Sequence, residues 1–192
     1  MILPIYAYGH KILKKVAKPV TRGYPDLGQL ILDMWQTMYN AKGVGLAAPQ
    51  VGLSLRLFVV DTIQLQKDAE EEGEEGEEPT ETGIKGVFIN PEKLTEPGEI
   101  WTYEEGCLSI PAIRGDIDRP REIYLKYYDE HFNERRILFR GMNARVIQHE
   151  YDHLEGVLFT ELIKPVKKNL IRRKLDNIRK GKIEPEYPMV FT

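Results

Sequence analysis

Residues 148–156 read QHEYDHLEG, and the five residues HEYDH at 149–153 are the part of the chain from which the fold can be worked out. Residues four apart lie on one face of an α-helix, so His149 and His153 can hold one metal ion while Glu150 reaches a water bound to it. Met142 and Val146 continue that face backwards with apolar side chains, which predicts that it points into the protein. The pattern is typical of metal-dependent hydrolases. Its alternative is a surface helix whose histidines are solvated, but unpaired histidines on an inward face would be costly.

The segments around this helix predict a fold class. Apolar residues at helical spacing indicate two further helices, at residues 25–42 and 166–180, and Asp26 is expected to cap the first of them. Strands are expected at residues 55–60, 87–90, 99–103, 122–128 and 135–139, separated by turns at 90–91, 97–98 and 129–133. Short turns between successive strands favour antiparallel pairing. We therefore expect an α+β fold, with antiparallel β-sheets around a central helix at residues 142–154 and a C-terminal helix.

Length and composition limit the possible classes. The chain has 192 residues, of which 42% are hydrophobic and 30% charged, so we expect a single domain covering 1–192. One cysteine excludes an internal disulfide and fits a reducing compartment. No apolar core of a signal peptide and no membrane-length apolar stretch occurs, and the net charge of −3 suggests neither DNA nor membrane as a partner. These features predict a cytoplasmic protein.

Two segments have strongly opposed charge. Residues 66–82 contain nine acidic residues and one lysine without a large apolar side chain, which predicts a flexible surface loop joining two strands. Residues 163–182 contain nine basic residues and one aspartate, most of them on the helix expected at about 164–180. Ile171, Leu175 and Ile178 give that helix one apolar stripe, which indicates packing on the protein body. Its basic face is then either solvated or docked on nucleic-acid phosphates.

A catalytic site of this kind needs a third protein ligand and an open position for water. In the metzincin pattern this ligand is a histidine six residues after His153, but residue 159 is phenylalanine. Glu161 and Glu184 remain as thermolysin-like candidates. Cys107, in the segment EEGCLSIP after an expected strand, is an upstream candidate, and its alternative is a small buried apolar residue.

Three motifs together resemble the signature motifs of the peptide deformylases, in the order that this family has them. They are GVGLAAPQ at 43–50, EGCLS at 105–109 and QHEYDHLEG at 148–156. The resemblance extends from the first expected helix to the third. It implies that Cys107, His149 and His153 bind a divalent ion, Fe²⁺ in the cell, with Zn²⁺, Ni²⁺ or Co²⁺ as substitutes.

The resemblance also implies the reaction, which is removal of the formyl group from the N-terminal formyl-methionine of newly made bacterial proteins with release of formate. Glu150 can accept a proton from the metal-activated water and pass it to the leaving amine. The side-chain amide of Gln50 and the backbone N–H of Leu108 are similar to the family's donors to the tetrahedral oxyanion.

Further positions are expected to bind substrate or to support the site. Gly45 is similar to the family position whose backbone pairs with the peptide substrate as an added strand. Val44, Met142 and Val146 are expected to line an apolar pocket for methionine. Glu105 and Arg114 match family positions that hold the cysteine-bearing strand, and a surface ion pair is their alternative.

Two rival functions stay open at this stage. The first is a Zn²⁺ endopeptidase that uses HEYDH with a late glutamate ligand. The second is a ribosome-binding protein with a structural ion, which His10 and His131 would have to complete. Because a formylated chain emerges from the ribosome, docking on ribosomal RNA is the alternative hypothesis to a solvated basic face on the C-terminal helix. Deletion of residues 165–192 is then expected to weaken ribosome association and to leave hydrolysis of a short formyl-peptide unchanged.

Overall fold

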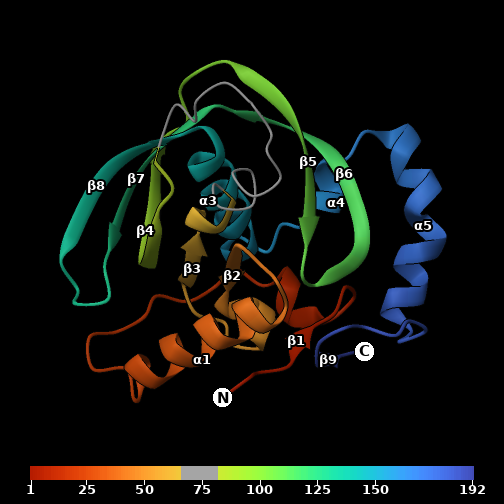
Figure 1. Cartoon of the computed structure of the whole chain (residues 1–192), viewed down its shortest axis with the longest axis horizontal. Helices are drawn as coiled ribbons and strands as arrows, with labels where there is room; N and C mark the ends of the chain where they lie inside the picture. The colour runs from red at the N-terminus through yellow and green to blue at the C-terminus, as the bar shows by residue number, and fades with distance from the viewer. Residues whose placement is uncertain (66–81) are drawn as a thin grey trace.

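The computed structural model describes residues 1–65 and 82–192 (Figure 1). The acidic segment 66–82 therefore lies outside the described residues except for Thr82. Within the described ranges, none of the helices combines the length and apolar character that crossing a bilayer requires.

The larger sheet has five antiparallel strands in the order β2-β3-β4-β7-β8. The strands are β2 (Gly45–Ala47), β3 (Leu57–Asp61), β4 (Lys85–Thr95), β7 (Glu122–Tyr128) and β8 (Glu134–Arg140). Strand β3, between β2 and β4, is buried along its whole length, as its sequence LFVVD leads one to expect. The edge strand β2 carries residues 45–47 of the motif at 43–50, and η2 carries the rest of it from residue 48.

A second sheet is a long antiparallel hairpin of β5 (Ile100–Cys107) and β6 (Ile110–Pro120). Leu108 and Ser109 form the turn between these strands. Alternate residues of β6 from Ile113 to Arg119 are buried, so one face of the hairpin covers the interior. Figure 1 shows α3 (Gly141–Leu154) between this hairpin and the larger sheet.

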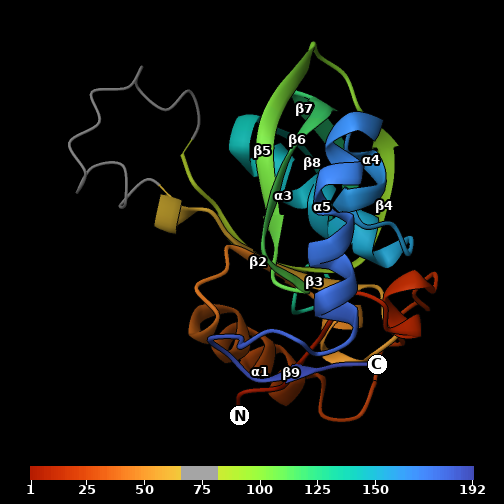
Figure 2. The same ribbon diagram turned by 90° about the vertical axis from the view of Figure 1, so that its right-hand side faces the viewer.

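The remaining elements close the structure around these two sheets. They are β1 (Ile5–Tyr6), the 3-10 helices η1 (Lys11–Lys14) and η2 (Ala48–Val51), α1 (Leu27–Asn40), α4 (Phe159–Leu162), α5 (Pro165–Arg179) and β9 (Met189–Val190). Helix α1 packs on β2 and β3. Helix α5 stands beside the hairpin (Figure 2) and buries Ile171, Leu175 and Ile178 against it, as expected from its apolar stripe.

The expected fold class is confirmed, because antiparallel sheets surround a central helix that carries HEYDH and a helix follows near the C-terminus. Three details were wrong. Asp26 does not cap α1, since its backbone is left-handed at φ 52° and its side chain makes no cap hydrogen bond. The turn expected at 90–91 is a bulge inside β4, with Asn90 at φ 49°. Strand β6 was not predicted at all, and neither were the short strands β1, β2 and β9.

Candidate active site

A cleft of about 690 Å³ opens between β2, the β5–β6 hairpin, α3 and the segment before β9. The structure brings to it eleven of the twelve residues singled out from the sequence. They are Val44, Gly45, Gln50, Glu105, Cys107, Leu108, Arg114, Met142, Val146, His149 and Glu150. The twelfth, His153, lies behind this lining and is 1% exposed.

Two side chains of the cleft lining and His153 behind it form a group that can hold a metal ion. Cys107 stands at the end of β5, and His149 and His153 lie one turn apart on α3. Their ligand atoms all lie within 4.8 Å of one another, and Cys107 Sγ is 3.3 Å from His153 Nε2. A thiolate and two imidazoles are suitable ligands for Fe²⁺, Zn²⁺, Ni²⁺ or Co²⁺. Three protein ligands also leave a position for water, as a catalytic site requires.

Glu105 supports this group from behind. Its Oε2 accepts a hydrogen bond from Nδ1 of His149 at 3.0 Å, which leaves the other ring nitrogen of His149 for an ion. Two arginines bind the same carboxylate: Arg119 at 2.6 and 3.0 Å, and Arg145 at 2.9 Å. Arg119 also donates to Asp152 of α3 at 2.7 Å. Glu105 is only 5% exposed, so this ion cluster joins the hairpin to α3 inside the protein.

The sequence reasoning missed Arg119, Arg145 and Asp152. The one usable signal for Asp152 was its place inside HEYDH, between the two histidines. Arg119 and Arg145 gave weaker signals, because an isolated arginine in a strand or helix is ordinarily on the surface. Here both arginines are buried, and both form ion pairs with the carboxylate of Glu105.

The pKa values of these groups differ in ways that burial and the ion cluster explain. Burial lowers the pKa of His153 well below its usual value, so its imidazole is neutral and able to bind a metal. Burial acts in the same direction on His149, but bonding to Cys107 and Glu105 outweighs it and raises the pKa. Burial alone would raise the pKa of Glu105, yet the bonds from His149 and Arg119 hold it below its usual range.

Glu150 has the environment of a proton-transfer group. It is buried on α3, and its Oε2 has no hydrogen-bond partner among the residues that the structure describes. Burial raises the pKa of this carboxyl to about 7, with the like charges of Glu105 and Asp152 acting in the same direction. A carboxyl that titrates near neutrality can both accept and return a proton.

Gln50 presents its amide nitrogen to the metal-binding group, beside Cys107. Its Oε1 accepts the backbone N–H of Ala47 at 2.9 Å, which turns Nε2 toward Cys107 Sγ at 3.6 Å and Ser109 Oγ at 3.3 Å. Leu108 follows Cys107 in the turn of the hairpin and also lines the cleft. The two donors named from the sequence are therefore both next to the cysteine, Gln50 through its side-chain amide and Leu108 through its place in the chain.

Strand β2 borders the cleft as an edge strand of the larger sheet. Gly45 has no room for a side chain, because a Cβ there would lie 2.8 Å from Cδ of Glu150. Val44, Met142 and Val146 line the cleft as expected. The close approach between β2 and α3 explains the glycine. The outer edge of β2, which pairs with no strand of the described residues, is available for backbone pairing.

Other residues named from the sequence lie outside the metal-binding group. Arg114 makes an exposed ion pair with Glu104 of β5, whereas the ion-pair partners of Glu105 are Arg119, Arg145 and His149. Glu161 binds Lys14 and the backbone N–H of Leu158, and Glu184 is exposed on the rim of the cleft. His10 caps η1, whereas His131 lies exposed in the turn after β7.

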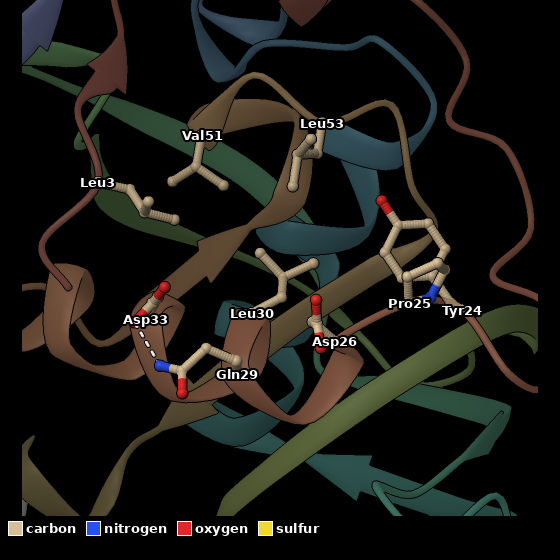
Figure 3. Close-up of a pocket in the computed structure, with 9 residues that line it drawn as sticks. All are labelled: Leu3, Tyr24, Pro25, Asp26, Gln29, Leu30, Asp33, Val51 and Leu53. Carbon is tan, nitrogen blue, oxygen red and sulfur yellow. Dashed lines mark hydrogen bonds between the residues drawn. The ribbon is translucent and has the colours of Figure 1, made fainter.

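A second, smaller pocket of about 350 Å³ lies against α1 (Figure 3). Its lining shares no residue with the cleft and includes neither histidine nor cysteine. Its polar side chains are Tyr24, Asp26, Gln29 and Asp33, and Figure 3 shows Gln29 bonded to Asp33. The cleft is therefore the candidate active site.

Comparison with known proteins agrees with this choice. The sequence model of the family described as "Polypeptide deformylase" matches residues 2–169. A peptide deformylase of Christiangramia forsetii is 52% identical over 191 residues, covering 100% of this chain and 96% of that protein. One from Flavobacterium psychrophilum is 51% identical, covering 98% and 96%.

Solved structures give the same result. The crystal structure of a peptide deformylase from Legionella pneumophila is 37% identical, with a TM-score of 0.77, and the match covers 95% of this chain and 98% of that one. The structure from Ehrlichia chaffeensis has a TM-score of 0.81 at 31% identity, covering 95% and 99%.

Proposed function

The chain belongs to the peptide deformylase family and removes the formyl group from the N-terminal formyl-methionine of newly made proteins, and we propose that the cleft does this with the residues named below. The observation that carries the assignment is the grouping of Cys107, His149 and His153 beside the unpartnered buried carboxylate oxygen of Glu150. A thermolysin-like endopeptidase lacks support, because no carboxylate joins this group among the described residues. A structural ion lacks support as well, because neither His10 nor His131 joins it.

Cys107, His149 and His153 would hold the metal ion of this metal-dependent hydrolase. When bound, the ion supplies a Lewis acid that acidifies water and polarises the formyl oxygen. We propose Fe²⁺ as the ion in the cell, following the resemblance of the three motifs, and the same ligands accept Zn²⁺, Ni²⁺ or Co²⁺. Glu105 keeps His149 in the orientation and tautomer needed for binding, by accepting its Nδ1–H.

Glu150 would move the proton. Its free Oε2 takes a proton from the attacking water, which a carboxylate with a raised pKa can do near neutral pH. The same oxygen then gives that proton to the amine nitrogen as the bond to the formyl carbon breaks. The products are formate and a free N-terminal amine.

Gln50 Nε2–H and the Leu108 N–H would donate to the oxygen that becomes negative when the formyl carbon is attacked. Gln50 is suited to this because the bond from Ala47 already fixes its amide and little reorganisation is needed. One such donor contributes about 100- to 1,000-fold in rate. The substrate backbone would pair with Gly45 on the β2 edge, and its methionine side chain would lie among Val44, Met142 and Val146.

The test is formate release from formyl-Met-Ala-Ser by protein purified without oxygen, with metal content measured on the same samples. The Glu150→Gln variant is expected to lose about 100- to 10,000-fold in kcat and to keep its metal. Cys107→Ala is expected to lose both metal and activity. Metal-loaded wild type that releases no formate would refute the proposal.

We also propose that the 192 residues act as one catalytic domain in the cytoplasm, where nascent chains are made. We further propose that helix α5 docks on ribosomal RNA. Its exposed basic residues without an ion-pair partner in the described chain support this; they are Lys168, Arg172, Arg173 and Lys174. Deleting residues 165–192 would not test ribosome docking alone, because residues 184–187 line the cleft and β9 pairs with β1. We therefore expect that deletion to impair hydrolysis as well.

Charge removal gives a cleaner test of docking. Replacing these four basic residues with glutamine is expected to weaken ribosome binding and to lower the slope of log affinity against log salt by up to about 3, since each phosphate contact contributes roughly 0.7–0.9. Hydrolysis of formyl-Met-Ala-Ser should stay unchanged. Co-sedimentation with ribosomes at several salt concentrations measures the slope, and unchanged binding would rule out docking through α5.

A further inference from the structure

The segment after α5 returns to the active site. We call residues 183–190 the C-terminal strap. The end of the strap, β9, pairs in parallel with β1, with Ile5 opposite Met189, and the N–H of Ile5 bonds to Pro188 at 2.8 Å. Figures 1 and 2 show the chain running from the lower end of α5 back to β1. Residues 184–187 of the strap line the cleft, so it contributes a wall of the active site.

Tyr187 connects this wall to the turn of the β5–β6 hairpin. Its hydroxyl donates to the backbone carbonyl of Leu108 at 2.7 Å. The neighbouring residue of the turn is held from two other directions: the Tyr8 N–H donates to the Ser109 carbonyl at 2.8 Å, and Gln50 Nε2 donates to Ser109 Oγ at 3.3 Å. Tyr187 therefore holds the Leu108 carbonyl of the turn.

Fixing Leu108 matters for the chemistry because its carbonyl and its N–H flank one α-carbon. The carbonyl bonded to Tyr187 limits rotation about that carbon, and this restricts where the N–H can point. The bond to Tyr187 limits the orientations open to this two-residue turn, and donors to a developing oxyanion act best when they are already in place.

We infer that Tyr187 is a positioning residue for deformylation, which holds Leu108 so that its N–H meets the oxyanion. The inference rests on the proposed role of Leu108 as a donor. The strap lies beyond residues 2–169, the segment matched by the family's sequence model, so the shared motifs alone do not provide this contact. The packing of the Tyr187 ring against the core around α1 positions the hydroxyl.

Tyr187→Phe tests the inference, because it removes the hydroxyl and keeps the ring. The kcat for formyl-Met-Ala-Ser is expected to fall about tenfold, less than the ~100- to 1,000-fold for loss of a whole donor, since the Leu108 N–H remains but is less restricted. KM, metal content and melting temperature should not change. The inhibition constant of the product Met-Ala-Ser, which has no formyl oxygen, should also stay the same.

Two comparisons separate this effect from loss of packing or failure of the proposed function. Tyr24→Phe, whose tyrosine lines the pocket on α1, is the matched control and should keep wild-type kcat. A rise in KM and in the product inhibition constant with unchanged kcat would mean that Tyr187 only shapes the wall, and would overturn the inference. Unchanged kcat in Tyr187→Phe together with a large loss in Gln50→Ala would overturn it too, while leaving the proposed function intact.

Discussion

Glu105 is the single residue on which the geometry of the candidate active site depends most. Its carboxylate accepts from His149, twice from Arg119 and once from Arg145, all in the interior. Burying charge costs several kcal/mol per ion, and only close pairing with good geometry offsets this cost. The two guanidinium groups and the Glu105 carboxylate offset the cost of burying one another's charge. The three side chains therefore hold the hairpin and α3 in one relative position.

Glu105→Gln is expected to lower the free energy of unfolding by about 3–5 kcal/mol, because it leaves the buried guanidinium of Arg145 without its counter-charge and Arg119 with Asp152 alone. Metal affinity should fall about 10- to 100-fold, since His149 loses its charged partner. Urea unfolding and metal titration measure the two effects. The control is Glu104→Gln: Glu104 pairs with Arg114 on the surface, and its loss should cost less than about 1 kcal/mol. Equal costs for the two variants would contradict this account.

At the scale of elements, the local sequence pattern predicted the helices and strands whose inward positions hold apolar residues or histidines. It failed for strands whose inward positions hold glycine or arginine. Helix α3 was predicted within one residue of its start, because apolar residues and histidines follow its helical period. Strand β6 was missed because Gly115 and Arg119 occupy two of its inward positions, and Ala112 at φ 59° interrupts its start. Gly115 is required by the close approach of Ile163. Missing the strand also meant missing Arg119 as a buried partner of Glu105.

The turn between β7 and β8 gives a pH-dependent prediction for an element. Asp129 Oδ1 accepts the N–H groups of His131 and Asn133 at 3.0 and 2.9 Å, and Oδ2 pairs with Arg135. Slight burial opposes these bonds, but together they lower the pKa of Asp129 to about 2. A depressed pKa means that the carboxylate stabilises the fold above its unfolded value near 3.8 and that this contribution is lost as pH falls toward 2.

Asp129→Asn is therefore expected to lower the free energy of unfolding by about 1–2 kcal/mol at neutral pH and by clearly less near pH 3. Urea unfolding at the two pH values measures the difference. Asp26→Asn serves as the control, because the Asp26 side chain makes no cap hydrogen bond, and its small effect should be the same at both pH values. A cost of Asp129→Asn that does not shrink in acid would show that the carboxylate charge is unimportant in this turn.

At the scale of the molecule, the active site is assembled from parts that are distant in sequence. Gly45 and Gln50 come from β2 and η2, Cys107 from the hairpin, and His149 from α3. The three motifs predicted that these parts meet, because each is recognisable by itself. The strap and its Tyr187 were not predicted, since a single hydroxyl bonded to a backbone carbonyl 79 positions away leaves no pattern in the sequence.

Because the ligands come from both the hairpin and α3, the metal ion is expected to stabilise the whole fold. An ion that binds only the folded state adds about 2.7 kcal/mol at 100 times its Kd, which for a chain of this size corresponds to roughly 5–10 °C in Tm. Chelation should therefore lower Tm by that amount, as measured by calorimetry with and without the ion. Cys107→Ser should lose the shift because a ligand is gone. Glu150→Gln should keep the shift, since Glu150 lies beside the ion without holding it, and loss of the shift in this variant would instead make Glu150 a ligand.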